Sequence, residues 1–160
     1  AMAGGGLGAL QSVYGTALPC VSIVEPDHVA CIYESVQQQD GATHPATGDN
    51  MTIMAGLNCG EVCQVTWPIM RDDADFCFAC DDRVTARGMR VLAAPRDGDA
   101  QVISGESGAV TSGLVSLLLC DPAYAALRDK LKLDEHSVIL LFSTEGDTDP
   151  EAYQTILANH

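Results

Sequence analysis

The sequence predicts an α/β fold, an open and mostly parallel twisted sheet flanked by helices. Apolar runs of strand length alternate along the chain with segments of helical periodicity, which is typical of parallel sheets. The run Val138–Phe142 has five consecutive apolar residues, as in a strand covered on both faces. The chain has 160 residues, of which 47% are hydrophobic, enough for one core. We therefore expect residues 1–160 to form a single α/β domain, with residues 1–3 as a cloning remnant.

The first half of the chain is expected to contain two strands among four helices. The strands are Cys20–Val24, which is rich in β-branched residues, and Asp75–Cys80. The helices cover residues 8–16, 27–37, 50–57 and 66–73, and a polar loop over residues 38–49 separates the second from the third.

The second half begins with a helix that Asp81 is expected to cap and that runs to Val91 or Leu92. A turn-rich loop over residues 95–101 leads to a strongly apolar helix over residues 107–119. Pro122 then opens a helix that continues to about Lys132. The strand Val138–Phe142 and a helix over residues 150–157 complete the pattern.

The net charge of -14, from 22 acidic and 8 basic residues, argues against nucleic acid and anionic membranes as partners. No apolar run approaches the roughly 20 residues that a membrane-spanning helix needs.

The chain shows no secretory leader, and it has seven cysteines, an odd number. A reducing compartment is the default for such a chain, so we expect it to be cytoplasmic.

A glycine-rich segment, Gly4-Gly5-Gly6-Leu7-Gly8, precedes the first expected helix. Adjacent glycines at a helix start let backbone N–H groups approach a phosphate, and the helix dipole adds attraction. One alternative is a flexible linker. Another is a dinucleotide site in a non-catalytic nucleotide-binding module, since Gly4-x-Gly6-x-x-Ala9 is followed by Glu25 at the end of the next expected strand.

Two cysteine pairs, Cys59–Cys63 and Cys77–Cys80, have a spacing similar to that of a four-cysteine zinc site. On a strand, however, Cys77 and Cys80 point to opposite faces, which does not suit ligation of one metal. A disulfide or a redox pair is a further alternative, and we expect no metal site.

Several blocks together resemble the C-terminal half of the fold type II pyridoxal phosphate enzymes, and most closely the diaminopropionate ammonia-lyase family. The similarity covers nearly the whole chain. The blocks are Gly6–Leu10, Val24–Pro26 with Cys31–Tyr33, Thr52–Leu57, Cys59–Glu61, Ile103–Val110 and Phe142–Asp149. The last two blocks are the most specific.

The resemblance implies a carbon–nitrogen lyase that uses pyridoxal 5'-phosphate and converts 2,3-diaminopropionate to pyruvate and ammonia by α,β-elimination. Other dehydratases of the same fold type and threonine synthase are the neighbouring alternatives. The resemblance also assigns the cofactor-binding residues. The glycine segment Gly4, Gly5, Gly6, Leu7 and Gly8 would hold the cofactor phosphate, Glu106 would pack beside the ring, and the Ser143 hydroxyl would face the ring nitrogen.

The resemblance further implies that the catalytic groups lie outside this chain. Enzymes of this fold type bind the cofactor through a lysine. The two lysines here, Lys130 and Lys132, are expected in a solvated position near a helix end. Glu25 matches a metal-binding acid of serine racemase-like relatives, but Cys31 stands where the second acid would be. We therefore expect an N-terminal half to be missing, the chain alone to be inactive, and the complete enzyme to be a homodimer acting on a small amino acid.

Overall fold

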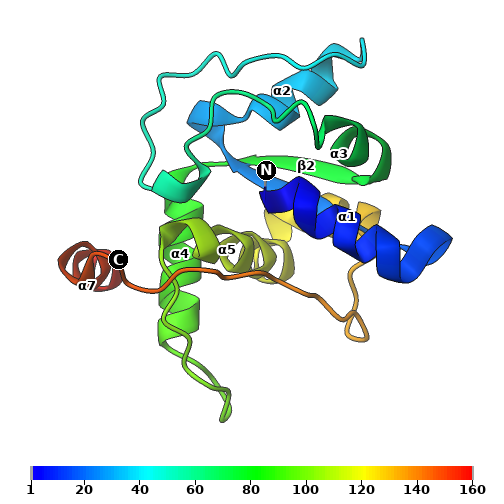
Figure 1. Ribbon diagram of the computed structural model, residues 1–160. Helices are drawn as coiled ribbons and strands as arrows, with labels where there is room; N and C mark the ends of the chain where they lie inside the picture. Colours follow the sequence, from blue (N-terminus) through cyan, green and yellow to red (C-terminus); the bar gives the residue numbers. More distant parts are fainter. Residues whose placement is uncertain (1, 160) are drawn as a thin grey trace. The chain divides into compact units, whose positions relative to one another are not determined.

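A computed structural model describes residues 2–159 (Figure 1). These residues form two compact units. The first unit comprises residues up to Thr52 together with Leu57–Ala79, and the second comprises Ile53–Gly56 together with the chain from Cys80 onward. Each unit is described by itself below, and the expectation of a single domain remains a prediction.

The first unit contains three helices and a pair of strands. They are α1 (Met2–Tyr14), β1 (Ser22–Pro26), α2 (Cys31–Gln38), α3 (Trp67–Asp73) and β2 (Phe76–Cys80), whose last residue falls in the second unit. Short 3-10 turns cover Gly15–Ala17 and Asp27–Val29, and a third lies at Ala55–Leu57. The predicted strands and the helix at 66–73 are thus confirmed, with β1 shifted two residues along the chain.

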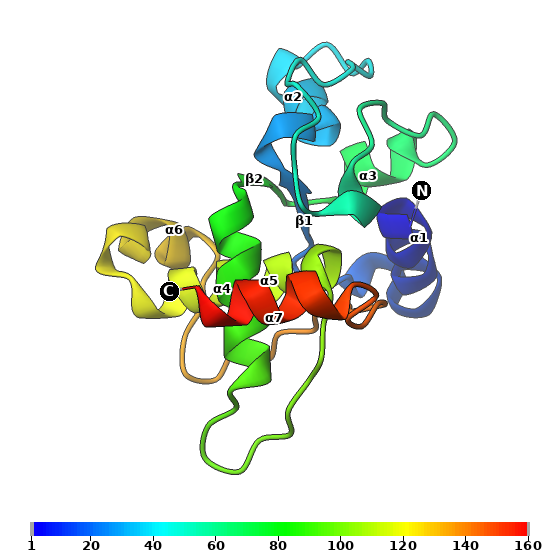
Figure 2. The same ribbon diagram turned by 90° about the vertical axis from the view of Figure 1, so that its left-hand side faces the viewer.

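The sheet of the described residues consists of β1 and β2, which run parallel. The carbonyl of Val21, just before β1, accepts hydrogen bonds from the N–H groups of Asp75 and Phe76 at 2.9 and 3.2 Å, so the two strands start at the same level. Helices accompany this pair, as Figure 2 shows, which confirms the α/β class. The core of this unit is formed by Ile23, Cys31, Val62, Trp67 and Met70.

The second unit is helical. It contains α4 (Asp82–Ala93), α5 (Glu106–Cys120), α6 (Ala125–Lys130), which follows a 3-10 turn at Pro122–Tyr124, and α7 (Pro150–Ala158). Helix α4 crosses α5 and also contacts α7 (Figures 1 and 2). Met89, Ala109 and Tyr153, one from each of these three helices, form its buried cluster.

Two glycines permit the close crossing of α4 and α5. A Cβ atom on Gly88 would overlap the carbonyl oxygen of Ala109, and a Cβ atom on Gly113 would overlap that of Val84. Glycine costs helix stability, so its presence in the middle of both helices reflects this approach of backbone to backbone.

The helix ends of this unit follow the sequence closely. Asp81 caps α4 by accepting a hydrogen bond from the N–H of Arg83, and Asp149 caps α7 by accepting one from Ala152. At the other end of α7, the Arg90 guanidinium donates to the carbonyls of Ile156 and Asn159 at 3.0 and 2.9 Å. These contacts attach α7 to α4.

Two predicted elements are wrong. Residues 50–57 form only the 3-10 turn at Ala55–Leu57, and Val138–Phe142 is not a strand. The latter segment runs extended (Figure 1), and the residues Val138 and Phe142 are 98% and 61% exposed. A strand needs a neighbouring backbone with which to exchange hydrogen bonds. Among residues 2–159, β1 and β2 pair with each other and no third strand joins them.

None of the helices between Met2 and Asn159 is by itself both long and apolar enough to cross a membrane. The pair Glu106–Cys120 and Pro122–Lys130 passes that test only when taken together, and it is bent by 90°.

Replacing Gly88 by alanine should lower the free energy of unfolding by about 1–3 kcal/mol, because the added methyl group meets the α5 backbone. Denaturant titration would measure the loss. The control variant Ser112→Ala on α5 adds no volume, so its free energy of unfolding should stay within about 0.5 kcal/mol of that of the parent chain. An equal effect of both substitutions would contradict the close helix crossing.

Candidate functional site

The two most specific sequence blocks lie against each other within the second unit. The backbone N–H of Gly105, just before α5, donates to the carbonyl of Glu145 at 3.1 Å. The Glu145 carboxylate in turn accepts from the N–H of Ser107 at 3.3 Å. A carboxylate at this position meets the positive end of the α5 dipole. The chain after Phe142 is therefore fastened to the start of α5.

Glycines make this approach possible. A Cβ atom on Gly105 would lie 2.6 Å from the carbonyl oxygen of Gly146. A Cβ atom on Gly108 would lie 2.6 Å from the Ser143 hydroxyl and 2.8 Å from that of Ser104. Any larger residue at either position would push the segment 143–146 away from α5.

The Ser143 hydroxyl lies 2.7 Å from the Ser104 hydroxyl. Ser104 is fully buried, whereas Ser143 is exposed. The Ser143 residue is therefore accessible at the surface, and the buried Ser104 hydroxyl lies within hydrogen-bonding distance of its hydroxyl. Sequence reasoning named Ser143 as a site residue and missed Ser104 and Glu145, although both belong to the quoted blocks.

Glu106 is the first residue of α5 and is half-buried. Its carbonyl accepts a hydrogen bond from the hydroxyl of the buried Thr85 on α4. An acid in the first turn of a helix is stabilised by the dipole, so this position has a structural reason in addition to its predicted place beside a cofactor ring.

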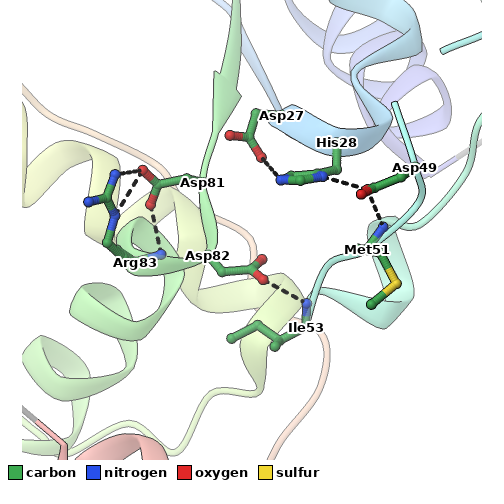
Figure 3. Close-up of polar contacts among 8 residues, drawn as sticks. All are labelled: Asp27, His28, Asp49, Met51, Ile53, Asp81, Asp82 and Arg83. Atoms are coloured by element: carbon green, nitrogen blue, oxygen red, sulfur yellow. Dashed lines mark hydrogen bonds and ion pairs between the residues drawn. The ribbon is translucent and has the colours of Figure 1, made fainter. Parts of the chain in front are cut away.

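A third segment, Ile53–Gly56, joins the same unit. The N–H of Gly56 donates to the Ser107 hydroxyl at 3.0 Å, and the N–H of Ile53 donates to the carboxylate of Asp82 at 3.1 Å. Figure 3 shows the second contact beside the Asp81–Arg83 pair at the start of α4. Backbone from three parts of the sequence therefore meets at the starts of α4 and α5.

The glycine segment lies inside a helix, which corrects the expectation of a loop ahead of one. Gly4 to Gly8 belong to α1, and none of these four glycines has a positive φ angle. Gly4 and Leu7 are buried, and a Cβ atom on Gly4 would overlap the Thr66 side chain. Gly5 and Gly6 are exposed, and a Cβ atom on either would meet nothing within 4 Å. Packing within the described residues thus explains Gly4 but not Gly5 or Gly6.

Glu25 has a structural role in the first unit. It is buried, and its two carboxylate oxygens accept hydrogen bonds from the N–H groups of Ile32 and Tyr33 in the first turn of α2, at 3.0 and 2.8 Å. The Cys31 thiol lies 3.6 Å from the same carboxylate. Burial raises the pKa of Glu25 above its ordinary value of 4.5, and it raises that of Cys31 to about 12.

The cysteine pairs do not form a metal centre in this structure. The seven cysteines are thiols rather than disulfides, and residues 2–159 contain no group of three His, Cys, Asp or Glu side chains that could hold a metal ion. Cys77 is half-buried on β2, and burial raises its pKa to about 11, which keeps the thiol protonated.

His28 and the two lysines lie in polar surface positions. In the first unit, His28 lies 2.6 Å from the Asp49 carboxylate, which also accepts from the N–H of Met51 (Figure 3). This contact with His28 lowers the pKa of Asp49.

Lys130 ends α6 and Lys132 follows it, and both are exposed, as the sequence predicts.

No protein-family model matches the chain. It is 46% identical over 143 residues to the diaminopropionate ammonia-lyase of Salmonella typhimurium, covering 89% of this chain and 35% of that protein. It is 45% identical over 157 residues to that of Escherichia coli K12, covering 98% of this chain and 39% of that protein. The chain therefore spans less than two-fifths of the relatives it matches and corresponds to their C-terminal part.

The comparison with solved structures points to the same enzymes as the sequence comparison. The E. coli diaminopropionate ammonia-lyase in complex with D-serine superimposes with a TM-score of 0.87 at 42% identity, covering 98% of this chain and 38% of that one. The same enzyme in complex with an aminoacrylate-PLP azomethine reaction intermediate superimposes with a TM-score of 0.85 at 43% identity, covering 98% of this chain and 39% of that one. Maize serine racemase, with a TM-score of 0.56 at 22% identity over 76% of this chain and 35% of that one, shares the fold alone. The resemblance to this family and the fold type are thus confirmed.

The pKa of Glu25 predicts a pH dependence of stability. Because the folded chain binds this proton more tightly than the unfolded chain, the contribution of Glu25 is complete below pH 4.5 and declines as pH rises through the folded pKa. Glu25→Gln removes that decline, so the free energy of unfolding of the variant should rise relative to that of the parent chain as pH increases above 4.5. Urea titrations across this range measure the difference, and a constant difference would contradict the assignment.

Proposed function

We propose that this chain is the C-terminal part of a pyridoxal phosphate-dependent ammonia-lyase that converts 2,3-diaminopropionate to pyruvate and ammonia by α,β-elimination. The observation that supports this most strongly is 45% identity over 98% of the chain to the E. coli enzyme of that name. The comparison with solved structures also favours this enzyme over threonine deaminase, whose structure matches at only 18% identity with a TM-score of 0.58.

The residues present fit the cofactor. Pyridoxal phosphate has an anionic tail, for which backbone N–H groups at a helix start are suitable ligands, and a ring nitrogen, for which a hydroxyl is one. The N–H groups without a partner inside α1 are those of its first turn, which ends at Gly4 and Gly5, and Gly5 and Gly6 are exposed there. Ser143 offers an exposed hydroxyl held by Ser104. We propose that the segment Gly4–Gly8 binds the phosphate, with Leu7 anchoring α1, and that Glu106 lies beside the ring.

The bound cofactor supplies the electron sink for the carbanion at the substrate Cα. In this proposal Ser143 keeps the ring nitrogen in a neutral hydrogen bond, because a hydroxyl, unlike a carboxylate, does not hold that nitrogen protonated. Helix α1 is expected to hold the phosphate through backbone N–H groups and its dipole. The lysine that binds the cofactor and the acids that move the substrate protons are assigned to the rest of the enzyme.

The complete protein is accordingly proposed to be a cytoplasmic homodimer, in which the part that corresponds to the N-terminal portion of the relatives completes the active site. Its substrate is a small amino acid, and neither nucleic acid nor a membrane is proposed as a partner.

The test is release of pyruvate from 2,3-diaminopropionate with pyridoxal phosphate present. We expect turnover by the complete protein and none by the 160-residue chain alone. Threonine and serine serve as comparison substrates for the related dehydratases. A complete protein that binds the cofactor but releases product only from threonine would contradict the substrate assignment.

Gly6→Ala should have opposite effects on stability and on cofactor binding. Alanine is the better helix former and meets no neighbouring atom here, so the chain should gain about 0.5–1 kcal/mol of unfolding free energy. The complete protein should bind pyridoxal phosphate more weakly, because the methyl group keeps the phosphate from the backbone. Ser12→Ala in the same helix is the matched control and should leave cofactor affinity unchanged. Unchanged affinity in Gly6→Ala would contradict the phosphate assignment.

A further inference from the structure

Ser104 carries a buried hydroxyl beside Gly105 and Gly108. It is 0% exposed. Among the described residues, its hydroxyl contacts the carbonyl of the adjacent Gly105 at 3.2 Å and the hydroxyl of Ser143 at 2.7 Å. The 2.7 Å contact has the usual length of an O–H···O hydrogen bond, whereas the 3.2 Å contact is long for one. The Ser104 proton therefore has two acceptors, of which Ser143 is the better placed.

We propose that Ser104 is a positioning residue that sets the direction in which the Ser143 hydroxyl donates its proton. The inference rests on the proposed function, since it concerns the contact between Ser143 and the ring nitrogen of the cofactor. It assigns a role to a residue that never touches the cofactor itself.

The reasoning follows from what a hydroxyl can do. Each has one proton to donate and two lone pairs with which to accept. If Ser143 donates to Ser104, it offers a ligand only lone pairs. If Ser104 donates to Ser143, the Ser143 proton is free to point outward, and donation in a row strengthens each bond. An unprotonated ring nitrogen is an acceptor, so it selects the second arrangement.

The surrounding backbone holds the two hydroxyls at this distance. Gly108 leaves room for both, since a Cβ atom there would come within 2.8 Å of each. The bonds from Gly105 and Ser107 to Glu145 fix the segment that contains Ser143. Ser104 cannot turn to solvent, because it is buried. The donor direction is thus limited to the two acceptors named above.

The experiment compares Ser104→Ala, Ser104→Cys and Ser143→Ala in the complete cofactor-loaded protein. It measures the dissociation constant of pyridoxal phosphate and the NMR shift of an isotopically labelled ring nitrogen. Ser104→Ala should weaken binding about 3- to 10-fold, the effect of one hydrogen bond, and should move the nitrogen signal in the same direction as Ser143→Ala. Ser104→Cys keeps the shape with a weaker donor and should give an intermediate shift.

Two controls separate positioning from simple stability. In the Ser143→Ala background, Ser104→Ala should change neither the affinity nor the nitrogen signal further. Ser116→Ala, which removes the hydroxyl that accepts from the Arg87 guanidinium at 2.9 Å, should leave both at the parent value.

The outcomes distinguish this inference from the function on which it rests. If Ser143→Ala shifts the nitrogen signal while Ser104→Ala only lowers the melting temperature, Ser104 is structural and the inference is overturned, whereas the function stands. If Ser143→Ala itself leaves the signal unchanged, the assignment of Ser143 fails, and the role of Ser104 fails with it.

Discussion

The contact between the start of α5 and the segment 143–146 is the constraint on which the candidate site depends. It joins two stretches of sequence almost forty residues apart through a pair of bonds to Glu145 and a pair of serine hydroxyls. The glycines at 105 and 108 have no substitute there, because any side chain would separate the two backbones. A site residue and its support are thereby fixed together.

Glycine serves three different purposes in this chain, and the structure separates them. Gly88 and Gly113 let two helices cross closely, Gly105 and Gly108 let a chain segment reach a helix start, and Gly4 makes room for Thr66. Gly5 and Gly6 have no such neighbour. A residue that weakens a helix without relieving any overlap within the chain is best explained by something that approaches its backbone from outside, and the proposed phosphate has that property.

Much of the site could be predicted from the sequence, because its parts are local signals. Ser143 follows an apolar run and Glu106 opens an apolar helix, while Asp81 caps α4 as the sequence predicts. Ser104 and Glu145 could not be singled out in this way. Their importance comes from contacts with residues about forty positions away, and nothing in the neighbouring sequence distinguishes them from ordinary polar residues.

The sequence by itself determined the positions of the helix starts in the second unit, the parallel strand pair and the resemblance that points to the cofactor. These depend on periodicity, capping and short motifs, which are read along the chain. Only the tertiary structure decided that Val138–Phe142 remains unpaired among the described residues and that the glycine segment lies within a helix. Strand formation requires hydrogen bonds to a neighbouring backbone, and that neighbour cannot be identified from the apolar run alone.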